Sequence, residues 1–181
     1  LAQDLGYAER NPEADVEGHD ACRKICILAS LAYSKHIYPE AVHTEGITNI
    51  TLDDVKYAEI WGGVIKLIGK VKRLPDKKCD IVVAPMFVPS TSQLSSIDDV
   101  FNGIMVRGDC TGDVVFYGKG AGKLPTASAV VADIIDCVKH LKERKLLFWS
   151  DSDNSSVIDY KESVTAMYIR TDSDSKDFAY N

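Results

Sequence analysis

The sequence lacks three features that would mark whole classes of protein: a long apolar run, a surplus of basic residues and a paired cysteine motif. No apolar stretch approaches the roughly 18 residues that a membrane-spanning helix needs. The 181 residues carry a formal net charge of −6, whereas proteins that bind nucleic acid usually present a basic face. We therefore expect no membrane segment and no nucleic-acid partner.

The five cysteines and four histidines follow no ligand-like spacing. The cysteines are odd in number, scattered and without a C-x-x-C pair, so they indicate neither a disulfide framework nor a zinc site, and a reducing cytoplasm is the expected location. No H-x-x-x-H or H-E-x-x-H pattern is present, so we expect no metal. Cys22, Cys26 and Cys137 fall on expected helix positions where small buried side chains belong, which argues against cysteine catalysis.

Apolar periodicity and capping patterns predict two helices in the first third of the chain. Apolar residues recur at three- and four-residue spacing from Val16 to about Ser34, with Asp15 as a plausible N-cap. In "TLDD" a hydroxyl is followed three residues later by an acid, so a second helix should begin at Thr51 and end at the Gly62–Gly63 pair.

The middle of the chain is rich in strand patterns. "VIKLIGKVKRL" and "CDIVVAPMFV" predict two strands that pair, "SQLSSIDDVFN" suggests a short helix, and "GIMVRGDCTGDVVFYG" predicts a hairpin with Gly112 in its turn. "PTASAVVADIIDCVKHLKE" then predicts a long helix with Pro125 near its start. Its apolar stripe, which we expect to dock on the rest of the domain, consists of Val130, Ile134, Cys137 and Leu141.

The two ends of the chain suggest a piece of a longer protein. The sequence begins at Leu1 without an initiator methionine or a signal peptide, in a stretch that resembles the last turn of a helix. Beyond Glu143 the composition becomes polar and loop-like, and "VTAMYIRT" then alternates like an isolated strand. Because a lone strand is not stable, it should either join the main sheet or open a neighbouring domain.

The stretch "YAERNPEADVEGHDACRK" gathers carboxylates ahead of a helix and then places a lysine among them. Asp20 and Lys24 are one helical turn apart, in an order that stabilises a helix by a few tenths of a kcal/mol. By itself such a pair is most often a solvated helix start. Because Glu9 and Asp15 precede it, a second reading is a site in which acids receive a substrate ammonium group.

A glycine-rich loop, "GKGAG", connects the predicted hairpin to the long helix. It is not a G-x-G-x-x-G fingerprint, because Lys123 stands at the last glycine position, and it is not a P-loop, because Leu124 follows that lysine. Two readings remain open here: a flexible connection, or a loop whose backbone approaches a ligand beside a helix N-terminus.

Three segments together resemble the catalytic and dimerising domain of homoserine dehydrogenase: "GYAERNPEADVEGHDACRK", "EGITNITLDDVKYAEIWGGVIKLIG" and "GDCTGDVVFYGKGAGKLPTASAVVADI". The likeness covers most of residues 1–143 in the right order. The first motif, E-x-x-P-x-x-D-x-x-G-x-D-x-x-R-K, is the most specific. "VTAMYIRT" is similar to the opening strand of the ACT-type regulatory domain of many bacterial members.

The resemblance implies interconversion of aspartate β-semialdehyde and L-homoserine with NAD(P)H, a step toward threonine, methionine and isoleucine. Lys24 matches the catalytic lysine that handles the proton of the reacting oxygen, and Asp20 the acid that orients it and helps to hold the substrate. Three residues match the substrate pocket: Glu9, Asp15 and Tyr7. Three match the loop near the nicotinamide: Gly120, Ala121 and Gly122.

The fold that the resemblance implies is α+β, with a mixed sheet covered by helices on one face and continued across a homodimer. Residues 1–148 would form the catalytic and dimerisation domain, and residues 149–181 a linker and the first strand of an ACT-type domain. The family's nucleotide-binding domain is missing, so the chain should be inactive alone. Two alternatives remain: a non-enzymatic dimerisation or amino-acid-sensing module, and a related semialdehyde dehydrogenase, which needs a nucleophilic cysteine.

Overall fold

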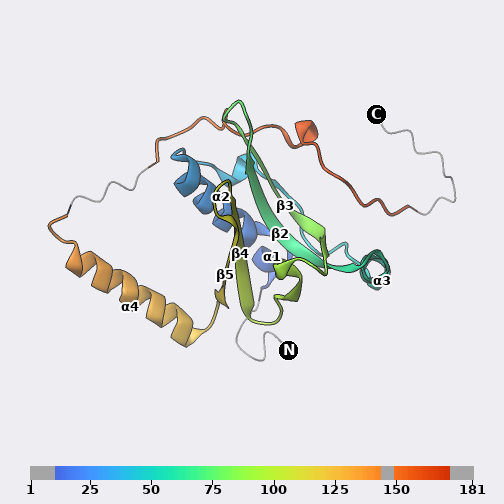
Figure 1. The fold of residues 1–181 in the computed structure, drawn as a ribbon, viewed down its shortest axis with the longest axis horizontal. Helices are drawn as coiled ribbons and strands as arrows, with labels where there is room; N and C mark the ends of the chain where they lie inside the picture. Colours follow the sequence, from blue (N-terminus) through green and yellow to red (C-terminus); the bar gives the residue numbers. More distant parts are fainter. Residues whose placement is uncertain (1–10, 144–148, 172–181) are drawn as a thin grey trace.

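The computed structural model describes residues 11–143 and 149–171 (Figure 1). The helices are α1 (Glu13–Val16), α2 (His19–Tyr33), α3 (Leu52–Trp61) and α4 (Lys123–Lys139), with short 3₁₀ turns at η1 (Pro39–Ala41), η2 (Gln93–Ser96) and η3 (Tyr160–Glu162). The strands are β1 (His43–Thr44), β2 (Gly63–Arg73), β3 (Cys79–Pro89), β4 (Phe101–Gly108) and β5 (Gly112–Lys119).

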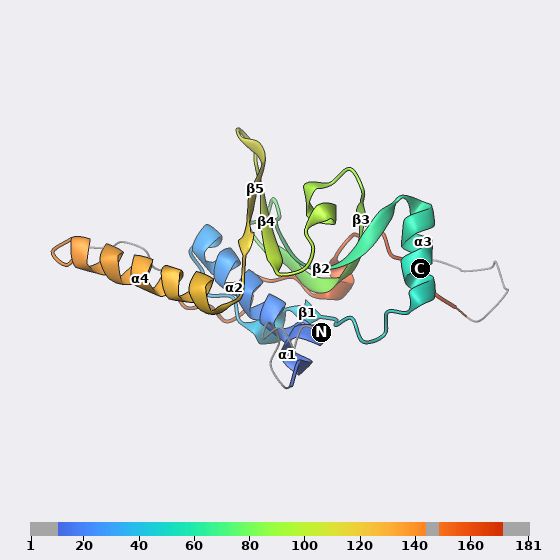
Figure 2. The same cartoon turned by 90° about the horizontal axis from the view of Figure 1, so that it is seen from below.

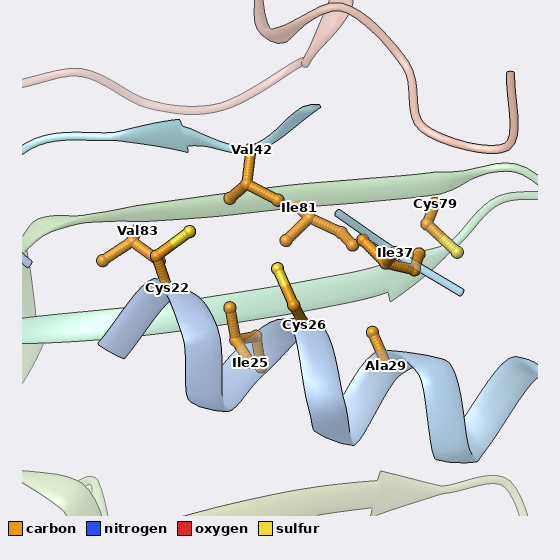
Figure 3. Close-up of a cluster of buried hydrophobic side chains, with 9 residues drawn as sticks. All are labelled: Cys22, Ile25, Cys26, Ala29, Ile37, Val42, Cys79, Ile81 and Val83. Carbon is orange, nitrogen blue, oxygen red and sulfur yellow. The ribbon is translucent and has the colours of Figure 1, made fainter. Parts of the chain in front are cut away.

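A mixed three-stranded sheet in the order β1–β3–β2 carries the core. β1 runs parallel to β3, and β2 pairs antiparallel with β3 from Gly63 opposite Pro89 to Arg73 opposite Cys79. α2 lies on one face of this sheet, and its side chains Cys22, Cys26 and Ala29 point toward the strands (Figure 3). The expected α+β fold and the pairing of the two central strands are thus confirmed.

The first predicted helix is divided at a glycine. Asp15 lies inside the short helix α1, whereas α2 begins at His19 after Gly18, so the prediction of Asp15 as N-cap is wrong. Gly18 has φ +78°, and a Cβ there would lie 3.3 Å from both Thr44 Cγ2 and Val83 Cγ1. Because the left-handed backbone and the tight contact both favour glycine, the chain turns here instead of continuing one helix.

Helix α3 is confirmed as predicted from its capping pattern. The Thr51 hydroxyl accepts from the Asp54 amide at 3.4 Å, and the Asp54 carboxylate accepts from the Thr51 amide at 2.7 Å, which closes a capping box. The helix ends at Gly62, whose φ is +95°.

The hairpin β4–β5 is also confirmed, and it forms a separate two-stranded sheet with Gly112 at φ +68° in its turn. The short helix predicted before it is the 3₁₀ turn η2. Lys66 of β2 holds this region by donating from Nζ to the Ile97 carbonyl at 2.7 Å and pairing with Asp98 at 2.6 Å. Figure 2 shows the hairpin standing beside the main sheet.

Helix α4 projects from the rest of the described chain in both views (Figures 1 and 2). Its expected stripe is solvent-exposed, with Val130 53% and Ile134 56% exposed. The prediction that this stripe docks within the same domain is therefore wrong for the described chain. No helix within residues 11–143 and 149–171 is long and apolar enough to cross a membrane.

Residues 149–171, which we call the C-terminal strap, run along the domain without forming a strand. The strap is tied to the end of α2 by Ser150, which exchanges backbone bonds with residues 34 and 36. It is tied to β3 by the Cys79–Val157 bridge and by Ser163 Oγ, which donates to Asp80 at 2.9 Å. Of the two alternatives for "VTAMYIRT", a place in the main sheet is not observed, since among the described residues no ladder includes it.

Candidate functional site

The two candidate catalytic residues lie together on the exposed side of α2. Lys24 Nζ is 2.7 Å from Asp20 Oδ2, and the two side chains are 60% and 43% exposed, respectively. They face away from the core because the buried positions of this helix, among them Cys22 and Ile25, point toward the sheet. The structure therefore brings this predicted pair together, in a position that a substrate can reach from solvent.

The other predicted substrate residues lie at or before α1. Asp15 is exposed on α1, which packs on the start of α2. The backbone amide of Ile47 donates to the Val16 carbonyl at 2.8 Å and so holds this acidic segment against the loop after β1. Tyr7 and Glu9 lie outside the described residues.

The glycine loop has the predicted place between a strand and a helix. Gly120, Ala121 and Gly122 lie between the end of β5 and the first turn of α4. Gly122 has φ +115°, and within the described chain no side chain caps the first amides of α4. Uncapped amides at a helix start can face an anionic or carbonyl group of a ligand, so these residues fit a loop that lies against a cofactor.

The buried thiols are poor nucleophiles. Cys22, Cys26 and Cys79 are buried. Burial, reinforced by the neighbouring Cys22, raises the pKa of the Cys26 thiol to about 12, and burial also raises the pKa of Cys79. Because the thiolate is the reactive form, these groups do not suit a semialdehyde dehydrogenase mechanism.

We expect iodoacetamide at pH 8 to alkylate the exposed Cys110 of the native protein while leaving Cys22, Cys26 and Cys79 unmodified. A raised pKa keeps a thiol protonated until the pH approaches that pKa, so little Cys26 thiolate exists at pH 8. Peptide mass spectrometry after a timed reaction measures this, and labelling in urea serves as the control in which all five thiols react. Rapid native labelling of Cys26 would contradict the assignment.

Within the described residues, no group of three or more His, Cys, Asp or Glu side chains could hold a metal ion. A small hollow does lie near the far end of α2, between Tyr33, Arg73 and Cys79. Tyr33 is thirteen residues beyond Asp20, which corresponds to about 20 Å along the helix. The hollow therefore does not belong to the candidate catalytic pair.

Asp54 is an unexpected centre of interactions. The sequence predicted Asp54 only as the acid of a capping pattern, yet its side chain is buried and accepts hydrogen bonds from Thr51 and, at 2.8 Å, from the Tyr168 hydroxyl. Arg170 forms an ion pair with it. Hydrogen bonds from Thr51 are the main cause of a lowered Asp54 pKa, and Tyr168 and Arg170 add to it. "TLDD" could reveal the cap, but no local signal points to partners more than a hundred residues away.

Comparisons with known proteins agree on one family. A family model described as homoserine dehydrogenase matches residues 1–135. The homoserine dehydrogenase of Helicobacter pylori is 42% identical over 168 residues, which cover 92% of this chain and 39% of that protein. The enzyme of Neisseria gonorrhoeae is 46% identical over 138 residues, covering 76% of this chain and 32% of the relative. The chain thus spans less than half the length of these relatives.

Solved structures give the same result. The homoserine dehydrogenase of Thiobacillus denitrificans matches with a TM-score of 0.79 and 36% identity, over 87% of this chain and 38% of that one. The S. aureus enzyme at pH 7.5 matches with a TM-score of 0.73 and 39% identity, over 82% of this chain and 37% of that one. A hyperthermophilic archaeal homoserine dehydrogenase in complex with NADPH matches with a TM-score of 0.60 and 28% identity, over 80% of this chain and 40% of that one.

Proposed function

The chain belongs to the homoserine dehydrogenase family, and on that premise we propose that it is the substrate-binding, catalytic portion of an enzyme that interconverts aspartate β-semialdehyde and L-homoserine. The reaction belongs to the biosynthesis of threonine, methionine and isoleucine. The observation that supports this most is the Asp20–Lys24 ion pair, which lies reachable on α2 within the part of the chain that matches the family. A non-enzymatic sensing module is not favoured, since it needs no proton donor and the relatives are dehydrogenases.

In the proposed reaction, Lys24 handles the proton of the reacting oxygen. As the aldehyde carbon accepts a hydride, its oxygen gains charge, and the Lys24 ammonium donates the proton that completes the hydroxyl group. Asp20, at 2.7 Å, holds the ammonium group in place. In the reverse direction the neutral lysine takes that proton back.

The acids around the pair suit an amino-acid substrate. The semialdehyde carries an α-ammonium group, which carboxylates bind through charge-assisted hydrogen bonds. We assign this role to Glu9 and Asp15, together with Asp20, and we place Tyr7 in the pocket wall.

NAD(P)H, when bound, supplies the hydride. In this chain Gly120, Ala121 and Gly122 would lie against its nicotinamide end, where the open backbone and the uncapped start of α4 allow a close approach. The nucleotide-binding domain itself lies outside the chain. We therefore expect the 181 residues alone to be inactive.

For the organisation of the whole protein, we propose a catalytic and dimerisation domain at residues 1–148 and a linker with the first ACT-type strand at residues 149–181. The ladder partners of that strand would lie beyond this chain. The exposed apolar side chains of α4 and of the β4–β5 hairpin, such as Ile134 and Phe116, suit burial against other parts of a homodimeric enzyme. The cytoplasm is its proposed location, with a small amino acid as partner and neither nucleic acid nor membrane.

The test is an assay of the full-length protein with aspartate β-semialdehyde and NADPH, followed by the loss of NADPH absorbance. We expect turnover on the order of 1 to 10³ s⁻¹, the usual range for enzymes, and none from the 181-residue chain at equal concentration. A folded full-length protein that binds NADPH but leaves the semialdehyde unreduced would contradict the proposal.

A further inference from the structure

The end of the C-terminal strap is fastened to the start of α3 by Asp54, Tyr168 and Arg170, which we call the Asp54 clasp. The Tyr168 hydroxyl donates to Asp54 Oδ1 at 2.8 Å, and the Arg170 guanidinium pairs with Oδ2. The Tyr168 ring also stacks on Phe87 of β3, with centroids 4.8 Å apart. The clasp therefore joins a segment near the end of the chain to both α3 and the main sheet.

The clasp is built around a buried carboxylate. The Asp54 side chain is only 2% exposed, and both of its oxygens are satisfied. Removing the partner of a buried charge strongly destabilises a protein, because the remaining charge has neither its hydration shell nor a compensating ion pair. The strap is consequently held in one position as long as Asp54 is ionised and paired.

Arg170 also holds the loop between β1 and α3, residues 45–50. Its guanidinium donates to the Asn49 carbonyl at 3.3 Å and to Thr51 Oγ1 at 3.0 Å, at the end of this loop. The loop is compact, since the Ile50 amide donates to the Ile47 carbonyl at 3.0 Å. One end of loop 45–50 is thus fixed by the strap.

The other end of loop 45–50 supports the junction between α1 and α2. The Ile47 amide donates to the Val16 carbonyl at 2.8 Å. Gly46 packs so closely on the junction that a Cβ there would overlap the Val16 carbonyl and lie 2.5 Å from Glu17 Cα. This junction lies between Asp15 and Asp20, two of the acids proposed to receive the substrate.

We propose that the Asp54 clasp positions the substrate site: through loop 45–50, Tyr168 and Arg170 set the placement of the α1–α2 junction and hence of Asp15 and Asp20. Tyr168 and Arg170 are positioning residues, since they act through the loop. By linkage, whatever moves the chain after Thr171 changes affinity for the substrate, and substrate binding tightens the clasp in return. The nature of the substrate rests on the proposed function, whereas the mechanical link does not.

If the clasp only anchored the strap, loosening the strap at any other tie would affect the substrate site in the same way. The strap has another side-chain tie, the hydrogen bond that Ser163 Oγ donates to Asp80, in which no atom of loop 45–50 takes part. Ser163→Ala therefore removes one tie of the same strap and leaves the hydrogen bonds of the Asp54 clasp and of loop 45–50 in place. It is the matched control for Arg170→Gln and for the milder Tyr168→Phe, which removes one hydroxyl and keeps the ring on Phe87.

The experiment compares these three variants in the full-length protein. For Arg170→Gln we expect about a tenfold rise in KM for aspartate β-semialdehyde, a size typical of coupling between sites, with the KM for NADPH unchanged. Tyr168→Phe should shift the same constant by less, and Ser163→Ala should match the wild type. Equal KM values for aspartate β-semialdehyde in Arg170→Gln and Ser163→Ala would overturn the proposal.

Hydrogen exchange tests the link without relying on activity. In Arg170→Gln and Tyr168→Phe, peptides covering residues 13–20 and 45–50 should exchange faster than in the wild type, and in Ser163→Ala they should not. Unchanged exchange in both clasp variants would refute the link, whatever the kinetics. Should the wild-type protein fail to reduce the semialdehyde, the proposed function is lost, and the exchange data still decide whether the clasp holds the junction.

Discussion

Lys24→Ala in the full-length protein is expected to lower kcat for reduction of the semialdehyde by about 10²–10⁴-fold, the usual contribution of a general acid. The reason is that Lys24 is proposed to donate the proton to the reacting oxygen, whereas its packing contribution is small. Its side chain is 60% exposed, and its only described ion pair is the one to Asp20. An exposed pair of this kind contributes at most about 1 kcal/mol, so the melting temperature should change little.

The matched control for this variant is Lys56→Ala. Lys56 forms a similar exposed ion pair within a helix, to Asp53 at 2.9 Å on α3, and it lies outside the proposed site. Steady-state kinetics and thermal unfolding of both variants separate chemistry from stability. The assignment of Lys24 is wrong if its variant retains near wild-type turnover, or if both variants lose activity equally.

Ile37→Ala is expected to lower the free energy of unfolding by about 2–5 kcal/mol, the usual cost of truncating a buried aliphatic side chain. Ile37 is 2% exposed and packs in the cluster between α2 and β3 (Figure 3). Alanine leaves a void that the sheet and the helix cannot close without moving. Urea unfolding followed by circular dichroism measures the change.

Ile60→Ala provides the comparison, since it makes the same substitution at a side chain that is 81% exposed on α3. We expect a change within about 0.5 kcal/mol there. If Ile37→Ala does not fold, Ile37→Val gives a graded reading, with an expected loss of about 0.5–1.5 kcal/mol. Similar values for the Ile37 and Ile60 variants would show that the cluster is not the core.

Features governed by neighbouring residues were predictable from the sequence. "TLDD" predicted the start of α3, and the Thr51–Asp54 capping box confirms it. The alternating apolar pattern predicted β2 and β3, and "DCTG" predicted the turn between β4 and β5. The pairing of Asp20 with Lys24 followed from their spacing on one helix. In each case the signal lies within one short stretch of the sequence.

Features that depend on distant segments were not predictable in this way. Gly18 divides the first helix because Thr44 and Val83 press against it. The stripe on α4 is apolar, yet in the described chain nothing covers Val130 or Ile134. The strap forms no ladder in this chain, and its tyrosine and arginine instead reach Asp54 across 114 and 116 residues.

The sequence by itself determined the family, most of the helices and strands, and the residues that carry the proposed chemistry, because these depend on local spacing and on side-chain type. Only the tertiary structure decided what lies against them: where the first helix breaks, which apolar face remains open, and which partners a buried carboxylate receives. A periodic apolar pattern predicts that a side chain will be buried, but the tertiary fold determines which residues it packs against.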